Sequence, residues 1–247
     1  LAALIAIPYS YIAAESFVQT NVVGTLNMLE AARSANVEKV IVASTSEVYG
    51  TPETTPILEA HPLKAQSPYA ATKIAADQLA MSFSTSFGLN VGIVRPFNTY
   101  GPRQSLRAVI PTVLAQMIAG KEEISLGSLH TLRDFVFVAD TVEGFVRMAV
   151  TDTAPGEVVQ LGTGKAVSIA DIVNMCRDIT DSKALIVERA ERVRPEASEV
   201  QVLLADPAKA SLLLDWEPQV NLQVGLKATA DWIREEPYAG DPTHFYR

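Results

Sequence analysis

Strand-length apolar runs alternate with segments of helical periodicity along most of this chain. Runs rich in β-branched residues predict strands at residues 40–43, 91–94, 135–138 and 158–161. Helical periods lie around them, at about residues 14–35, 68–87, 109–119, 140–150, 168–180, 206–213 and 222–235. Strands that alternate with helices form parallel sheets whose two faces are covered. The sequence therefore predicts an α/β fold built on a parallel sheet.

The composition narrows the classes of partner. With 247 residues, of which 48% are hydrophobic, the chain is long enough for one core or for two interleaved subdomains. A formal net charge of −8 argues against a nucleic-acid partner and against an anionic membrane surface. No apolar run approaches the length of a membrane span, and the apolar opening at residues 1–7 lacks the basic flank of a signal peptide. We therefore expect no contact with nucleic acid or membrane.

Cysteine and histidine usage argues against disulfides and metal sites. The single cysteine, Cys176, lies in an apolar-periodic stretch, which predicts a small core side chain and fits a reducing, cytoplasmic location. The three histidines share no ligand spacing and have no cysteine partner, so no metal site is expected. Trp216 and Trp232 are expected to pack the C-terminal subdomain.

Tyr69 and Lys73 form the candidate centre of the chemistry. Ser67 as N-cap and Pro68 at the first helical position predict that a helix starts here. A spacing of four then places the phenol and the ammonium on one helix face, a turn apart. A cation so placed favours the phenolate, which would lower the pKa of the tyrosine and let it act as a base. This layout predicts proton and hydride removal from a carbinol carbon; the alternative is a solvated helix face.

Four segments carry motifs in a fixed order, namely Ser44-Thr45-Ser46-Glu47-Val48-Tyr49-Gly50, Tyr69-x-x-x-Lys73, Arg95-Pro96-Phe97-Asn98-Thr99-Tyr100-Gly101-Pro102-Arg103 and Arg133-Asp134-Phe135. Together they resemble the motifs of the extended short-chain dehydrogenase/reductases that act on nucleotide sugars. Tyr-x-x-x-Lys alone is a weak signal, whereas all four in order over nearly the whole chain are specific. Segments 104–111 and 194–200 are most similar to those of GDP- or UDP-N-acetylglucosamine 4,6-dehydratases.

The resemblance implies a Rossmann-type parallel sheet that binds NAD, with a smaller C-terminal α/β subdomain that binds the nucleotide sugar. The NAD-binding part is expected at residues 1–101 and 134–165. The substrate-binding part is expected at residues 102–133 and 166–235, followed by a tail at 236–247.

One family feature does not occur in this sequence. Relatives carry a Gly-x-x-Gly-x-x-Gly turn that seats the cofactor pyrophosphate on a helix N-terminus. Here the nearest glycine cluster, Gly162-Thr163-Gly164, lies far downstream. Ala2 and Ala3 resemble a cofactor-contacting segment that follows the fourth strand of relatives. By this resemblance the chain begins about four strands into the fold, and the sheet is expected to be N-terminally incomplete.

The resemblance also implies catalytic roles. Tyr69 would be the base on the sugar 4-hydroxyl, Lys73 would bond the nicotinamide ribose, and Thr45 would bond the 4-oxygen. Glu47 would remove the C5 proton of a 4-keto sugar while an acid assists loss of the 6-hydroxyl as water, which makes a 4,6-dehydratase. Many dehydratases have Asp at the position of Ser46; Ser here resembles the variant of GDP-mannose dehydratases and leaves the identity of the C6 acid open.

Other reactions and another class stay open. A 4-epimerase needs no C5 base, nucleotide-glucuronate decarboxylases also show Ser-Glu at this position, and Glu47 could instead cap a strand end. The rival of a different class is a non-catalytic module that binds a nucleotide sugar or dimerises without seating NAD.

The expected contacts to cofactor and substrate come from both halves of the chain. Cofactor contacts are expected from Ala2, Ala3, Ser44, Tyr69, Lys73, Pro96 and Asn98. Substrate contacts are expected from Asn98, Arg103, Val109, Ile110, Arg133, Arg194 and Glu199. The arginines would bind the diphosphate, Glu199 the nucleotide ribose, and the two aliphatic residues the base. For any single arginine, surface solvation remains the alternative.

Relatives use the helices at 14–35 and 68–87 to form a dimeric four-helix bundle. Both helices show apolar spacing, at Val18, Val22, Val23, Leu26 and Leu29 and at Ile74, Ala75 and Leu79. The resemblance therefore predicts a homodimer through these helices.

Overall fold

The computed structural model describes residues 1–189 and 196–238. Its main sheet has the strand order β1-β2-β6, all parallel, with bounds Val40–Ala43, Val91–Pro96 and Glu157–Leu161. Val94 of β2 pairs with Ala43 on one side and with Val159 on the other. The chain therefore forms the parallel sheet that the apolar runs predict.

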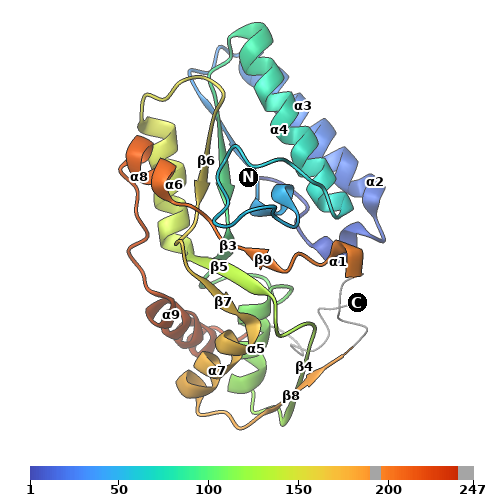
Figure 1. Cartoon of the computed structure of the whole chain (residues 1–247), viewed down its shortest axis with the longest axis vertical. Helices are drawn as coiled ribbons and strands as arrows, with labels where there is room; N and C mark the ends of the chain where they lie inside the picture. Colours follow the sequence, from blue (N-terminus) through green and yellow to red (C-terminus); the bar gives the residue numbers. More distant parts are fainter. Residues whose placement is uncertain (190–195, 239–247) are drawn as a thin grey trace.

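Helices cover this sheet on both faces (Figure 1). On one face lie α3 (Gly24–Ser34) and α4 (Pro68–Phe87), whose Leu29 and Phe83 share a buried cluster with Val91 and Ile93. On the other lie α6 (Val138–Val150) and α8 (Ala208–Leu214), next to β2 and β6 respectively. Apolar side chains buried from two directions explain the near-continuous hydrophobic runs of the strands.

The run at 135–138 is the exception to the single-sheet expectation. Strand β5 (Leu132–Phe137) does not pair with the main sheet; it lies in a second sheet. There it pairs with β3 (Asn98–Tyr100), antiparallel β7 (Ala166–Ser168) and β9 (Val202–Leu203). β2 ends at Pro96, the chain leaves the main sheet at Phe97, and β3 begins at Asn98. An apolar run predicts a strand but carries no information on its partner.

A smaller α/β unit occupies the lower part of Figure 1. It contains α5 (Val109–Ile118), α7 (Ile169–Thr180), α9 (Leu222–Glu235) and the parallel pair β4 (Glu123–Leu126) and β8 (Leu185–Glu188). Its core includes Cys176, fully buried as expected, with Trp232 packed against it. The Rossmann-type fold with a second α/β unit is confirmed, while the residue bounds of the two parts stay a prediction.

Trp216 does not belong to that smaller core. It lies after α8 in the cluster that contains Val94 and Val159, and its indole donates to the carbonyl of Asp140 at 2.8 Å. The expectation for Trp216 is therefore wrong, because α8 returns to the main sheet and packs beside β6 and α6.

The predicted helix at 14–35 is helical throughout but changes pitch. It consists of α2 (Ala14–Phe17), a π-helical segment η1 (Val18–Val23) and α3. Inside the π-segment the buried amide of Asn21 bonds both backbone groups of Leu4 and donates to the hydroxyl of Thr72. These bonds tie the segment before α1 (Ile7–Ser10) to α4. Within residues 1–189 and 196–238, no helix combines the length and apolarity of a membrane span.

Candidate active site

Helix α4 begins where its sequence predicts. The hydroxyl of Ser67 accepts the N–H of Ala70 at 3.1 Å, and Pro68 occupies the first turn, where its missing N–H costs nothing. Tyr69 is thereby fixed in the first turn and Lys73 one turn later.

Tyr69 lies in an apolar setting, with 6% of its surface exposed. Ile7 of α1 packs against it, and the ring of Phe17 meets it edge-on at 6.2 Å between centroids. Its hydroxyl is hydrogen-bonded to the side chain of Thr45. Burial raises the pKa of Tyr69, opposed by the Thr45 bond and assisted by the charge of Glu47.

Thr45 links the tyrosine to the candidate C5 base. It is the N-cap of a short 3₁₀-helix, η2 (Ser46–Tyr49), and its oxygen accepts the N–H of Glu47 at 3.2 Å. Ser46 is buried and Glu47 is half-buried. The structure thus brings Thr45, Glu47 and Tyr69 together at the carboxyl end of β1.

Lys73 is directed to the same strand end, not to the phenol. It is 5% exposed, and its ammonium donates to the carbonyl of Ala43 at 2.6 Å. Burial lowers the pKa of Lys73, and the nearby Asp77 opposes that shift. The expected lowering of the Tyr69 pKa by Lys73 is therefore not met in this structure, because burial dominates at Tyr69 and Lys73 bonds a backbone oxygen.

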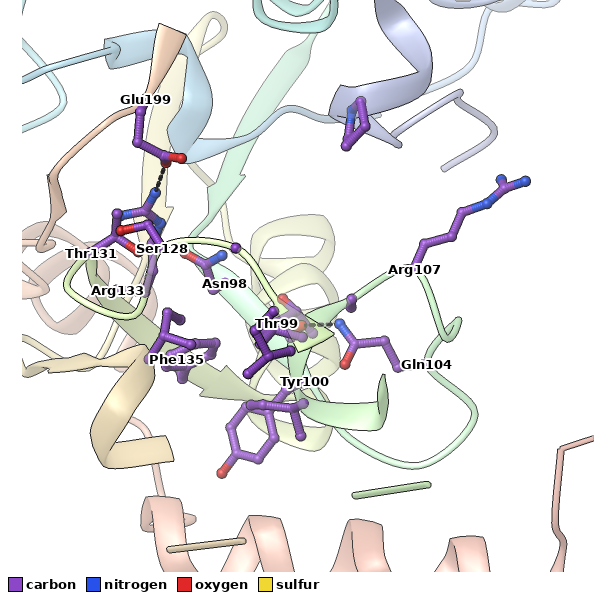
Figure 2. A pocket seen from close by; sticks show the side chains of 17 residues that line it. Asn98, Thr99, Tyr100, Gln104, Arg107, Ser128, Thr131, Arg133, Phe135 and Glu199 are labelled. Carbon is purple, nitrogen blue, oxygen red and sulfur yellow. Dashed lines mark hydrogen bonds and ion pairs between the residues drawn. The ribbon is translucent and has the colours of Figure 1, made fainter. Parts of the chain in front are cut away.

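A cavity of about 260 Å³ is lined by residues of β3, β5 and α5 and of the loops beside them (Figure 2). It gathers most of the predicted substrate residues, which are Asn98, Val109, Ile110, Arg133 and Glu199. Arg133 and Glu199 form an ion pair at 3.2 Å, with both side chains largely buried. Pro8 of α1 lines the cavity and its neighbour Ile7 packs on Tyr69, so α1 connects the cavity to the catalytic edge.

Some lining residues were not singled out by their sequence. Gln104, Arg107, Ser128 and Thr131 face the cavity, whereas Arg103 is not among its lining residues and is exposed with a φ of 67°. Arg103 thus lies outside the cavity lining, and its role in substrate binding stays a prediction. The signal for Gln104 and Arg107 was their place in the 104–111 motif; a lone Ser or Thr carries no such signal.

The remaining predicted contacts lie at varied positions. Ala2 is exposed, Ala3 is half-buried, and Pro96 is half-buried at the end of β2. Ser44 is buried and donates to Asp77. Arg194 lies outside the described residues, while η4 (Glu196–Ser198) leads into Glu199.

The edge formed by β1 and β2 offers groups suited to the nicotinamide half of NAD. The side-chain oxygen of Asn98, the first residue of β3 and two residues beyond β2, is buried and has no hydrogen-bond partner among the described residues. A ligand N–H or O–H would satisfy it, as would be expected of a carboxamide or a sugar hydroxyl. With Ser44, Thr45 and Lys73 at the neighbouring strand end, these residues fit that half of the cofactor.

Comparisons with known proteins agree with this geometry. Residues 1–229 match the family described as GDP-mannose 4,6 dehydratase. A UDP-glucuronate 4-epimerase of Thermodesulfobacterium geofontis is 33% identical over 223 residues, covering 89% of this chain and 66% of that protein. A dTDP-glucose 4,6-dehydratase of Actinoplanes sp. is 30% identical over 225 residues, covering 91% and 69%. The chain thus spans about two thirds of the length of these relatives.

A solved structure extends the agreement to the fold. DesIV from Streptomyces venezuelae, a dTDP-glucose 4,6-dehydratase crystallised with NAD and TYD, aligns with a TM-score of 0.87 at 29% identity. The alignment covers 96% of this chain and 72% of DesIV. The resemblance seen in the motifs is therefore confirmed. The chain belongs to the GDP-mannose 4,6-dehydratase family, a group of NAD-dependent epimerases and dehydratases that act on nucleotide sugars.

Proposed function

We propose that the chain carries the active site of an NAD-dependent nucleotide-sugar 4,6-dehydratase. The observation that carries the proposal is the group of Thr45, Glu47 and Tyr69. The Thr45 side chain bonds the phenol of Tyr69 and the backbone N–H of Glu47, and the Glu47 carboxylate lies close enough for its charge to raise the pKa of Tyr69. A dehydratase needs a second base beside the oxidation site, whereas a 4-epimerase does not.

The first step assigns Tyr69 and Thr45 to the sugar C4. Ser44, Lys73 and Asn98 would hold NAD, which would supply a hydride acceptor for C4 and then a hydride donor for C6. Tyr69 removes the proton of the 4-hydroxyl, and Thr45 donates a hydrogen bond to the oxygen as it becomes a ketone. Because burial raises the pKa of Tyr69, the phenol rests in its neutral form, ready to hydrogen-bond the sugar.

The second step assigns Glu47 to C5. A 4-ketone makes the C5 proton acidic, and the half-buried carboxylate of Glu47 removes it as the 6-hydroxyl leaves as water. Ser46 is buried beside it and is a candidate to assist that departure. The product is a 4-keto-6-deoxy sugar.

The cavity is proposed to hold the nucleotide diphosphate. Arg107 and Arg133 supply cations for the phosphates, and Val109 and Ile110 supply apolar surface for the base. Glu199 would bond the ribose hydroxyls while it keeps Arg133 in place through their ion pair. NAD and a nucleotide sugar are therefore the proposed ligands.

A second reaction is favoured by one observation. The 33% identical relative is a UDP-glucuronate 4-epimerase, and an epimerase needs only Tyr69 and Thr45. A decarboxylase would use the same oxidation on a glucuronate substrate. The different-class alternative, a non-catalytic module, predicts no cofactor retention.

Cofactor retention is measured first. The purified chain is incubated with excess NAD, freed of unbound NAD and denatured, and the released NAD is quantified. Stoichiometric release supports an enzyme. Absence of release contradicts activity of the chain by itself and favours the non-catalytic alternative.

The reaction is then identified by mass spectrometry of nucleotide-sugar products made in deuterated water. Loss of one water with deuterium at C5 supports the dehydratase, whereas unchanged mass with inverted C4 supports the epimerase. Glu47→Gln should stop water loss yet keep oxidation at C4. The control is Glu38→Gln, an exposed glutamate remote from these motifs. Normal dehydration by Glu47→Gln would contradict the proposed role.

We also propose a cytoplasmic homodimer through η1, α3 and α4. Val18, Val23 and Met28 are exposed on these elements, as an interface requires. Light scattering on the purified chain should give twice the monomer mass, and Met28→Lys should give the monomer. A wild-type monomer would contradict this.

A further inference from the structure

Asp77 is a fully buried carboxylate that the proposed reaction does not use. It lies on α4 one turn beyond Lys73 and is 0% exposed. One of its oxygens accepts the hydroxyl of Ser44 at 2.9 Å and two guanidinium nitrogens of Arg95 at 3.1 and 3.0 Å. The other oxygen is buried and has no hydrogen-bond partner among the described residues.

Lys73 and Asp77 together fasten α4 to the end of β1. Lys73 donates to the carbonyl of Ala43, and Asp77 accepts from the hydroxyl of the next residue, Ser44. These two contacts are one helical turn apart on α4 and one residue apart on the strand. They therefore set both the height and the rotation of the helix that carries Tyr69 at its first turn.

Arg95 extends this arrangement across the sheet. Its guanidinium donates to the hydroxyl of Tyr49 at 3.1 Å, lies over the Tyr49 ring, and donates to the carbonyl of Glu59. The hydroxyl of Tyr49 in turn donates to the side chain of Gln160 on β6 at 3.2 Å. Asp77 is thus held by Ser44, which directly follows β1, and by Arg95 of β2.

Asp77 is the carboxylate that compensates the positive charges of two buried cations. Lys73 and Arg95 are both buried, and Asp77 is the carboxylate that interacts with each. A buried ammonium without a nearby anion loses its proton readily.

We propose that Asp77 is a positioning residue of the catalytic pair: it holds Lys73 at the end of β1 and supplies the negative charge that keeps its ammonium protonated. The inference rests on the proposed role of Tyr69 and Lys73 in proton transfer. Arg95 and Ser44 fix Asp77 through its bound oxygen, next to the strand end where Lys73 bonds the carbonyl of Ala43.

The test measures Lys73 itself, so it does not depend on turnover. Lysines labelled with ¹³C are titrated by NMR in the full chain, and Lys73→Arg identifies the Lys73 signal. Asp77→Asn should lower the Lys73 pKa by about one unit or more, a tenfold change in its proton affinity. The matched control is Asp178→Asn, an exposed aspartate on α7, which should leave the Lys73 pKa unchanged.

A double variant separates positioning from folding. Asp77→Asn leaves Arg95 without its anion and can destabilise the chain for that reason alone, whereas Asp77→Asn with Arg95→Gln removes both charges. The double variant should recover thermal stability yet keep the lowered Lys73 pKa, and Asp77→Glu should restore the pKa. An unchanged Lys73 pKa in a folded single or double variant overturns the proposal. So does a double variant that cannot fold, since Asp77 would then be a folding residue. If the Lys73 shift is seen but no sugar is turned over, the proposed function fails while this inference stands.

Discussion

Two buried aspartates, Asp134 and Asp77, are held in opposite ways. Both are 0% exposed, and burial raises the pKa of each. Asp134 on β5 accepts with both oxygens: the N–H and hydroxyl of Thr163, the N–H of Gly164 and that of Ala205 bond it at 2.6–3.3 Å. Asp77 receives all its bonds on one oxygen, chiefly from the cation of Arg95.

The difference reflects what each carboxylate holds. Backbone N–H groups are neutral and fixed, so they seat Asp134 without a second buried charge and join β5 to the turn after β6. Gly162 is required there because a Cβ would lie 2.2 Å from that of Ala205. The Gly162-Thr163-Gly164 turn therefore binds the carboxylate of Asp134, a side chain of the same protein. Asp77, by contrast, depends on charge, lies beside a catalytic candidate and keeps one oxygen unbonded.

The largest expected loss of unfolding free energy comes from removing Arg95, the cation that bonds Asp77. Arg95→Gln leaves a buried carboxylate without its charged partner, which should lower the free energy of unfolding by about 3–5 kcal/mol. Urea unfolding measures it. Arg189→Gln is the control, because its ion pair with Glu123 is half exposed and should contribute less than about 1 kcal/mol. Equal effects of the two substitutions would contradict the charge dependence of Asp77.

Asp134→Asn should lower the free energy of unfolding by somewhat less than Arg95→Gln does. The amide retains one acceptor oxygen but turns an NH₂ group toward backbone donors, which leaves buried N–H groups unbonded. We expect a loss of about 2–3 kcal/mol in the free energy of unfolding, measured by urea titration. Since no cation is left behind, removing Lys or Arg residues elsewhere should not rescue it. A neutral substitution with no loss would show that the turn holds its shape unaided.

Tyr49, which accepts a hydrogen bond from Arg95, should make the free energy of unfolding depend on pH in the alkaline range. Burial raises the pKa of Tyr49 to about 12, from 10.0. The native state then binds the phenolic proton more tightly than the unfolded state. This contribution is therefore complete below pH 10 and is lost as pH rises from about 10 to 12, by about 2 kcal/mol. Tyr49→Phe should remove that part of the pH dependence of unfolding; an unchanged slope would argue against it.

The smallest expected loss of unfolding free energy comes from removing the neutral donor to Asp77, Ser44, rather than the charged donor, Arg95. Ser44→Ala removes one hydrogen bond to Asp77 but leaves Arg95 in place, so the free energy of unfolding should fall by about 1 kcal/mol. Thr163→Val offers the matched change at Asp134, where backbone donors remain. Calorimetry of both variants compares them. A Ser44→Ala loss as large as that of Arg95→Gln would mean that Ser44, not the cation, holds Asp77.

Local signals in the sequence determined the elements and much of the site. Ser67 and Pro68 specify the start of α4 because capping involves only neighbouring residues, and the spacing of Tyr69 and Lys73 then follows from helix geometry. The apolar runs gave the strands of the main sheet. The motif residues Val109, Ile110, Arg133 and Glu199 do meet at one cavity.

Only the tertiary structure decided which partner each element and side chain found. Strand β5 pairs in the second sheet instead of the main one, and Lys73 donates to the carbonyl of Ala43. Arg107, not Arg103, reached the cavity. Periodicity and capping depend on neighbours within about a turn, so the sequence shows them directly. Sheet partners, buried ion pairs and pKa shifts depend on groups far apart along the chain, which meet only once the layers have packed.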